Sequence, residues 1–195
     1  MNLIERVKNI LTTPKTEWLV IETETTTPPA LLMSYVLPLL VVYSIGSLLG
    51  GLFWAGTWGF QYFLISALIS FISAAISFYV SSYVIDMLAP SFASEKNINK
   101  SAQLVAYSNT AVWVAGFFTF IPLLGWLVLI AGAVYSIYLM YLGIGPLKKT
   151  PEDKKVVYMI IAFLVIIIIG AIISYLLRVI IFRAMGYTLL GGWGY

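Results

Sequence analysis

The stretch VVYMIIAFLVIIIIGAIISYLLRVI, residues 156–180, is the strongest indication of the fold class. Arg178 is its only charged side chain. A helix needs about 20 mostly apolar residues to cross the hydrocarbon core of a bilayer. The stretch therefore predicts a helix that spans a membrane.

Four more apolar runs precede it, at about residues 30–52, 61–88, 104–121 and 123–144. The whole chain of 195 residues is 61% hydrophobic and only 10% charged, whereas soluble domains carry about 25% charged residues. The sequence predicts an all-α fold, a polytopic membrane helix bundle with five transmembrane helices.

The N-terminal residues predict short helices on the membrane surface. Residues 2–11 place five apolar side chains on one helical face and polar side chains on the other, as in a helix lying in the membrane interface. A solvent-facing helix packed on a partner is the alternative. A second short helix follows, with Trp18 as an interface anchor.

These patterns divide the chain into three parts. Residues 1–29 are expected to form a cytoplasmic interfacial segment, residues 30–183 a five-helix transmembrane domain, and residues 184–195 a short Gly-rich tail.

The basic residues predict the orientation. Basic residues favour the cytoplasmic side of a membrane. With the N-terminus in the cytoplasm, nine of the 11 lysines and arginines lie inside, and only Arg178 and Arg183 lie outside. The expectation is a multi-pass integral membrane protein with a cytoplasmic N-terminus and an external C-terminus, which in a prokaryotic cell means the cytoplasmic (inner) membrane.

The composition argues against catalysis. The chain has no histidine and no cysteine, so it lacks the usual general base, thiol nucleophile and most zinc ligands. No paired carboxylates suggest acid–base chemistry. We expect no enzyme activity, cofactor or metal, and no basic patch suggests a nucleic-acid partner.

Polar residues interrupt the third apolar run in AYSNTAVW, residues 106–113. Tyr107, Ser108 and Asn109 are candidate binding residues, because polar groups inside a membrane often mark functional sites. The alternative is hydrogen bonding between helices. For Asn109 the expected partners are serines of the second run, or the backbone freed by Pro38.

Further candidates lie at the ends of the runs. Asp86 is the only acid within a predicted span, and it could reach the interface, pair with Lys100 or carry a proton. Tyr135 and Tyr138 share one side of the fourth span, and either pack internally or line a groove for lipid headgroups. The loop after that span carries four lysines that could contact a partner or anionic lipids: Lys148, Lys149, Lys154 and Lys155.

Small residues at four-residue spacing predict close helix packing. The second run carries Ser66, Ser70 and Ala74 on one ridge and Ser73, Ser77 and Ser81 on the next. The first run carries Gly46 and Gly50. We interpret these ridges as packing surfaces rather than a pore lining.

An ordered series of short motifs runs through the chain: TPKTEW, LAPSFASEKN, QLVAYSNTAVWVAG, FIPLLG, YSIYLMYLGI and LKKTPEDK. Together they resemble the Yip family of Ypt/Rab-interacting membrane proteins, in particular its prokaryotic branch, from about residue 10 to about residue 170. The resemblance implies a compact five-helix membrane domain with a cytoplasmic N-terminus.

The resemblance also implies a role in membrane trafficking or organisation. Eukaryotic members associate with prenylated Rab-type GTPases and carry a DLYGP-like motif before the first span. This chain has TEWLVIETE there and lacks that motif.

The favoured hypothesis is a non-enzymatic integral membrane protein that organises the membrane or recruits partners. Those partners are membrane lipids, a membrane or cytoplasmic protein, or a second copy of the chain. The alternative is a small transporter, channel or lipid scramblase with a polar path near Tyr107, Asn109 and Asp86.

Overall fold

The chain folds as a bundle of long helices. The computed structural model describes residues 2–58 and 60–184, and every regular element within them is a helix. The elements are, in order, α1 (Leu3–Thr12), α2 (Pro14–Thr23), α3 (Pro28–Leu31), η1 (Leu32–Val36), α4 (Leu37–Trp58), α5 (Phe60–Leu88), η2 (Ala89–Phe92), α6 (Ile98–Ser108), α7 (Thr110–Gly116), η3 (Phe117–Phe120), α8 (Leu124–Lys148) and α9 (Glu152–Ala184). The predicted all-α membrane bundle is confirmed. Residues 185–195 of the predicted tail lie outside the described residues.

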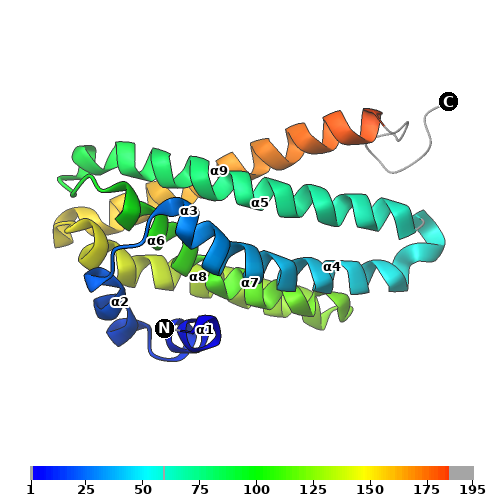
Figure 1. Cartoon of the computed structure of the whole chain (residues 1–195), viewed down its shortest axis with the longest axis horizontal. Helices are drawn as coiled ribbons and strands as arrows, with labels where there is room; N and C mark the ends of the chain where they lie inside the picture. The colour runs from blue at the N-terminus through cyan, green and yellow to red at the C-terminus, as the bar shows by residue number, and fades with distance from the viewer. Residues whose placement is uncertain (1, 59, 185–195) are drawn as a thin grey trace.

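The chain runs along the bundle axis five times (Figure 1). α4 leads away from the N-terminal helices, α5 returns, and α6 and α7 lead away again. α8 then returns, and α9 ends far from α1 and α2. We call the end that carries α2, the residues 93–97 connection and the residues 149–151 connection the charged end.

The prediction of five long spanning helices was off by one, because one of the five passes along the bundle is made of shorter elements. Four helical segments in the described part of the chain are long and apolar enough to cross a membrane: Pro28–Leu52, Phe60–Phe92, Leu124–Lys148 and Glu152–Ala184. The run at 104–121 is instead divided among α6, α7 and η3.

Asn109 explains the break in that run. It stands between α6 and α7, and its side-chain amide donates to the carbonyl oxygen of Val105 at 2.8 Å. Asparagine competes in this way with the helical hydrogen bonds of the backbone. Residues 101–108 of α6 are all buried, and α6 and α7 pack against α4, α5 and α8. Irregular backbone at membrane depth is tolerated where protein covers it.

Proline shapes the first spanning segment in a similar way. Pro38 has no N–H to donate, and its ring would clash with the carbonyl group four residues earlier. The five residues before Leu37, Leu32–Val36, form a wider π-helical turn. Such a turn relieves the crowding and lets the helix continue into α4.

The glycines of α4 bring helices together as predicted. A Cβ atom on Gly46 would lie 2.2 Å from the carbonyl oxygen of Phe117, and one on Gly50 would lie 3.4 Å from the Cα atom of Phe120. The absence of a side chain therefore lets α4 pack directly on the backbone of η3.

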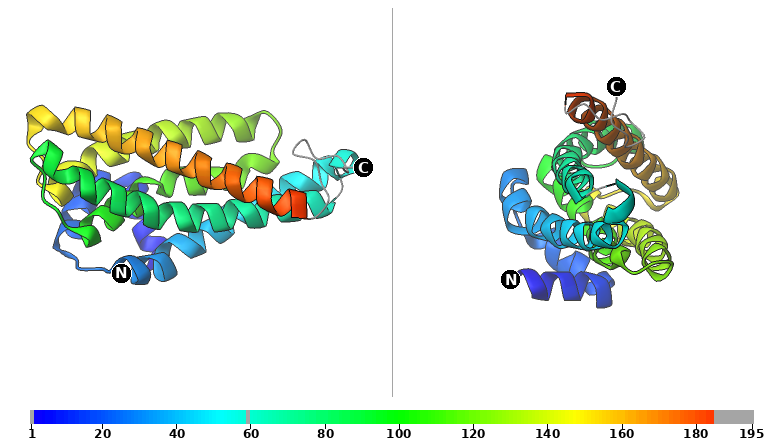
Figure 2. Two further views of the ribbon diagram at one scale, coloured as in Figure 1. Left: turned by 90° about the horizontal axis from the view of Figure 1, so that it is seen from above. Right: turned by 90° about the vertical axis from the view of Figure 1, so that its right-hand side faces the viewer.

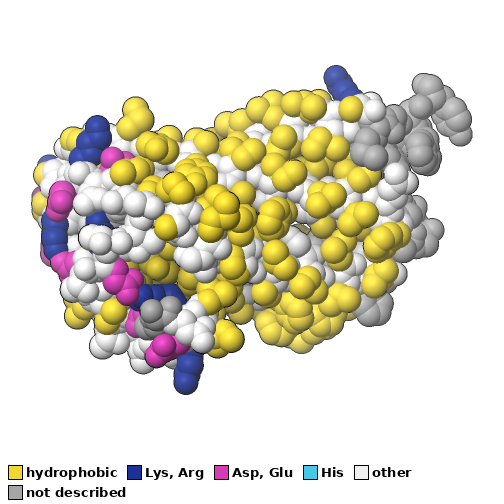
Figure 3. Space-filling view, viewed as in Figure 1, with side chains coloured by type: hydrophobic (Ala, Val, Ile, Leu, Met, Phe, Trp, Pro, Cys, Tyr) yellow, Lys and Arg dark blue, Asp and Glu magenta, His cyan; other side chains and the backbone are white. Residues whose placement is uncertain are grey.

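The exterior separates by polarity. Apolar side chains cover the body of the bundle, and acidic and basic side chains gather at the charged end (Figure 3). Large exposed apolar residues occur along every long helix, for example Leu68, Trp126, Val134 and Ile168. Lipid is the solvent that suits such a surface.

The N-terminal helices lie beside this body. When the bundle is seen end-on, α1 is seen along its length, so α1 lies across the bundle axis (Figure 2). This is the direction expected of a helix in the membrane plane. The sequence pattern had placed Arg6 on the polar outer face, but Arg6 is buried, as is Ile10. Trp18 is also buried, with only 1% of its surface exposed, and is not an exposed interface anchor.

Candidate functional site

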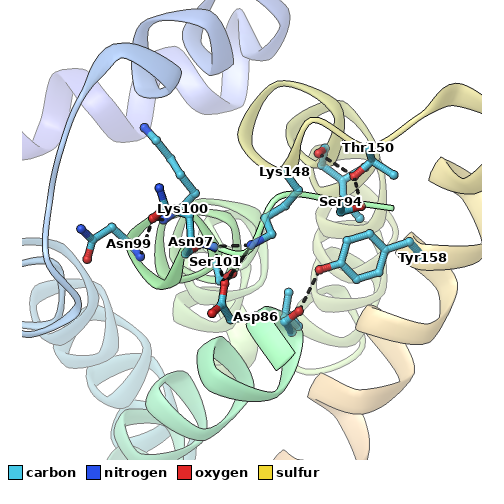
Figure 4. A network of polar contacts seen from close by, with 11 residues as sticks. Asp86, Ser94, Asn97, Asn99, Lys100, Ser101, Lys148, Thr150 and Tyr158 are labelled. Carbon is cyan, nitrogen blue, oxygen red and sulfur yellow. Dashed lines mark hydrogen bonds and ion pairs between the residues drawn. The ribbon is translucent and has the colours of Figure 1, made fainter. Parts of the chain in front are cut away.

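A buried ion pair lies at the centre of the charged end. The ammonium group of Lys148 is 3.0 Å from Oδ1 of Asp86, and the Lys148 side chain is fully buried. The same Asp86 oxygen accepts from the backbone N–H of Asn97 at 2.7 Å and from the hydroxyl of Ser101 at 3.0 Å. Lys148 also lies 2.7 Å from the Ser101 hydroxyl oxygen. Three helices, α5, α6 and α8, therefore meet at one carboxylate (Figure 4).

Neighbouring polar contacts extend this network to α9. The hydroxyl groups of Ser94 and Thr150 are 2.9 Å apart. The Tyr158 hydroxyl donates to the carbonyl oxygen of Ile85 at 2.8 Å, and the Tyr158 ring stacks on Phe92 at 4.7 Å. These contacts tie together the ends of four helices, α5, α6, α8 and α9.

A second ion cluster holds the N-terminal helices. Arg6 donates to Glu17 at 2.6 Å and also pairs with Glu24. Its guanidinium lies over the Tyr107 ring, 5.4 Å from the ring centre. Buried charges require such pairing. Arg6 therefore joins α1, the end of α2 and α6.

Lys100 closes the end of α2. Its ammonium group donates to the carbonyl oxygens of Ile21, Glu22 and Glu24, at 3.1, 2.7 and 2.7 Å. The last carbonyl groups of a helix lack the usual partner four residues on, and the Ile21 carbonyl instead accepts a cap bond from the Glu24 backbone N–H at 3.2 Å. The negative end of the helix dipole also favours a cation there. Burial lowers the pKa of Lys100, while the charges of Glu22 and Glu24 act in the opposite direction.

Lys100 had been considered as a partner of Asp86. The structure pairs Asp86 with Lys148 instead. Arg6, Glu17 and Ser101 were missed by the sequence reasoning, because the pattern of a surface helix gives no sign that a charge is buried. Asn97 was detectable, since its side chain caps the start of α6 as asparagine often does.

Tyr107 belongs to an aromatic cluster. Its ring meets Tyr35 edge-on at 4.7 Å and Trp18 edge-on at 6.2 Å. Gly143 of α8 admits Trp18, because a Cβ atom on Gly143 would lie 2.7 Å from the indole ring. The cluster seats α2 against α6 and α8.

The other polar residues of AYSNTAVW have separate surroundings. Thr110 hydrogen-bonds to the Tyr35 hydroxyl at 2.7 Å. Ser108 is buried and its hydroxyl has no partner among the described residues. Asn109 bonds within its own helix, so the expected partners for its amide, serines of the second run or the backbone near Pro38, were wrong. Asn109 also lines a cavity between helices.

The tyrosines of α8 lie near the junction of α1 and α2. The Tyr135 hydroxyl donates to the carbonyl oxygen of Leu11 at 2.8 Å. Tyr138 is 40% exposed. Together with Thr12, Thr13 and Lys15, both tyrosines line a groove of about 410 Å³.

The four lysines after the fourth span divide into two kinds. Lys148 is buried in the ion pair, so it cannot reach a partner. Lys149 pairs with Glu22 and is largely exposed, Lys155 pairs with Glu152 at 3.2 Å, and Lys154 is exposed.

Comparison with protein families decides the identity of the fold. The model of the Yip1 domain matches residues 8–174 of the chain. The chain belongs to the Yip family. This Yip1 domain is the body of a multi-pass integral membrane protein, as the long apolar helices in the described part of the chain indicate. No curated protein and no solved structure matches the chain.

The ordered motifs acquire a structural meaning in this Yip1 domain. TPKTEW brings Glu17 and Trp18 to the bundle, and LAPSFASEKN contributes Ser94 and Asn97 to the network. LKKTPEDK contributes Lys148 and Thr150. Segments far apart in the sequence therefore meet at the charged end.

Proposed function

We propose that this Yip1-domain protein is a non-enzymatic membrane protein that organises the membrane or recruits a protein partner through its charged end. The charged end faces the cytoplasm, the N-terminus lies inside and the C-terminus outside. In this proposal residues 1–29 are the interfacial segment, residues 30–183 the membrane domain and residues 184–195 the tail.

The internal pairing of the buried charges carries the proposal. Arg6, Glu17, Asp86 and Lys148 are all buried, and each has an ion-pair partner inside the fold. A catalytic group needs a free reactive atom that a substrate can reach. Groups committed to one another instead give a rigid platform, which is what a docking surface requires.

The exposed face of α2 is the best candidate for the docking surface. Leu19 and Val20 are 57% and 45% exposed, beside the exposed Lys15. Lys149 pairs with Glu22 of α2, and Lys154 lies in the first turn of α9, so both add positive charge at this end of the bundle. This combination of apolar and basic side chains suits an acidic protein surface or the headgroups of anionic lipids.

The groove beside Tyr135 and Tyr138 is a second lipid contact in this proposal. It combines two tyrosine rings with Lys15 and threonine hydroxyls. Tyrosine rings are enriched at the level of the lipid headgroups.

A transport path is the weaker candidate. It was expected to join Tyr107, Asn109 and Asp86. Tyr107 lies in the aromatic cluster, Asp86 in the ion pair with Lys148, and Asn109 beside a cavity that neither of the other two lines. These separate surroundings do not favour a continuous path.

The test is extraction of the protein into lipid nanodiscs, followed by mass spectrometry of the retained proteins and lipids. We expect a protein partner at fixed stoichiometry that is lost in the double variant Leu19→Glu, Val20→Glu. The control is Glu5→Gln together with Lys8→Gln, which alters exposed residues of α1. A partner retained equally by both variants would place docking elsewhere, and retention of lipids alone would contradict partner recruitment.

A further inference from the structure

A cavity lies within the membrane body, away from the charged end. It has a volume of about 270 Å³, is lined by α4, α5, α9 and the α6–α7 segment, and is partly open to the outside. On α5 it is lined by residues 70–81, and on α9 by residues 166–174, both well inside the long apolar helices. It is therefore at the depth of the hydrocarbon core.

The lining combines hydroxyl groups with apolar side chains. Ser70, Ser77, Ser81 and Ser174 line it together with the amide of Asn109. Phe78 and Trp113 are the large apolar members. We had interpreted the serine ridges of α5 as packing surfaces, yet three of these serines face a cavity.

Two of the hydroxyls have unmet hydrogen-bonding capacity. The hydroxyl oxygens of Ser77 and Ser81 are buried and have no partner among the described residues, and Ser81 has no exposed surface at all. Ser82, the next residue, shows the usual solution, because it donates to the carbonyl oxygen of Phe78 at 2.6 Å. A buried hydroxyl without a partner destabilises the fold, because its lost hydrogen bonds to water are not replaced. Ser77 and Ser81 therefore leave donors available to a bound molecule.

Asn109 adds a third group. Only one of its two amide N–H groups is used by the bond to Val105. Its amide is thus able to reach a carbonyl or hydroxyl group in the cavity while it holds the break between α6 and α7.

The chemistry of the lining defines the ligand. Among the lining residues only Tyr43 carries a titratable group, and none is an acid, lysine or arginine. A phosphate or an ammonium group would have no opposite charge there, and burying it unpaired is very costly. An uncharged hydroxyl or ester group would find donors and acceptors.

The size of the cavity limits how much of the ligand enters. Pockets that bury a whole drug-sized ligand measure about 300–1,000 Å³, so a cavity of about 270 Å³ holds only part of a lipid. α4 and α9 both pack along α5 but make little contact with each other. A hydrocarbon chain can therefore extend from the cavity between α4 and α9 into the bilayer.

We propose that this cavity binds the uncharged polar end of a neutral glycerolipid, with a hydroxyl or ester group bonded to Ser77, Ser81 and Asn109. The site is independent of the docking surface on α2. It would make the Yip1 domain sensitive to the neutral lipid content of its membrane.

The experiment uses the full chain in phosphatidylcholine nanodiscs with a diacylglycerol that carries a diazirine near its ester group. We expect photolabelling of α5 peptides around residues 70–81 and of α9 peptides around residues 166–174. The double variant Ser77→Ala, Ser81→Ala is expected to reduce this labelling roughly tenfold, as two lost hydrogen bonds predict. Gly170→Leu is expected to block it, since a Cβ atom there meets only the Ser77 hydroxyl, at 3.9 Å.

Ser73→Ala is the matched control. Ser73 is also buried on α5, and its hydroxyl has no partner in the part of the chain that the structure describes, but it does not line the cavity. Equal labelling of Ser73→Ala and the double variant would overturn the proposal. So would equal labelling by a diazirine phosphatidylcholine, because it would show that the uncharged headgroup does not matter. No labelling at either peptide would mean that the cavity holds water rather than lipid.

Discussion

Asp86 and Lys148 illustrate how a membrane protein stabilises a charge away from water. Asp86 gains three donors, from Asn97, Ser101 and Lys148. The Lys148 side chain is fully buried. Each of the two buried charges is balanced by the other, so the pair favours an arrangement in which α5 and α8 end beside each other.

Removal of one partner is expected to be costly. Lys148→Met leaves the Asp86 carboxylate buried without its cation, and we expect a loss of about 3–5 kcal/mol of stability. Asp86→Asn together with Lys148→Met should be less destabilising than the sum of the single changes, because no charge is left alone. Unfolding of the four proteins in nanodiscs, followed by circular dichroism, measures this coupling. Strict additivity would mean that the ion pair does not exist in the membrane.

The packing of Trp18 against Gly143 can be tested by substitution of the glycine. A Cβ atom at this position would lie 2.7 Å from the indole ring, so Gly143→Ala must displace α2 from α8. Overpacking of this kind costs about 1–3 kcal/mol. Faster hydrogen exchange in residues 14–23 is the expected result.

Gly170→Ala is the control for that change. Its Cβ atom would meet only the Ser77 hydroxyl, at an ordinary contact distance of 3.9 Å. Equal rates of hydrogen exchange in the two variants would show that close packing against Gly143 does not hold Trp18 in place.

At the scale of the elements, the long apolar runs were predictable, whereas the helix break at Asn109 was not. The runs at 30–52, 61–88, 123–144 and 156–180 correspond to helices that meet the length and polarity required for a span, because hydropathy alone determines them. The run at 104–121 is equally apolar in part, but Asn109 breaks it and protein covers the break. Hydropathy does not reveal such burial, and for the same reason it did not reveal the buried side of Arg6.

The contact between Lys100 and the end of α2 can be tested at the scale of the elements. Lys100→Met removes the cation from the three carbonyl groups at the end of α2. Hydrogen bonds to charged groups contribute about 1.5–3 kcal/mol, so α2 should detach locally without unfolding the bundle. Protease cleavage within residues 22–27 is expected to accelerate in nanodiscs.

Lys96→Met provides the comparison, because Lys96 is exposed on the neighbouring connection. If both variants are cleaved at the same rate as the unchanged chain, Lys100 does not hold α2.

At the scale of the whole molecule, sequence and structure describe the same polarity. Nine of the 11 basic residues fall in segments that the lysine pattern assigns to one side, and the charged side chains gather at one end of the bundle. The sequence could not show which of these charges pair with one another, since the pairs join segments such as Arg6 with Glu24 and Asp86 with Lys148. Only the folded structure shows which charges are buried in pairs and which are exposed.

The orientation of the molecule can be measured directly, because the chain has no cysteine and a single introduced cysteine is therefore labelled without background. Lys96→Cys reports on the charged end, and Leu123→Cys reports on the opposite end, where Leu123 is 78% exposed in the turn before α8. The positive-inside bias predicts that a membrane-impermeant maleimide labels Leu123→Cys in intact cells and labels Lys96→Cys only after permeabilisation. The reverse pattern would place the charged end outside, where a cytoplasmic partner could not reach α2. Labelling of both positions in intact cells would mean that the two ends are not separated by a membrane, and would contradict the spanning bundle itself.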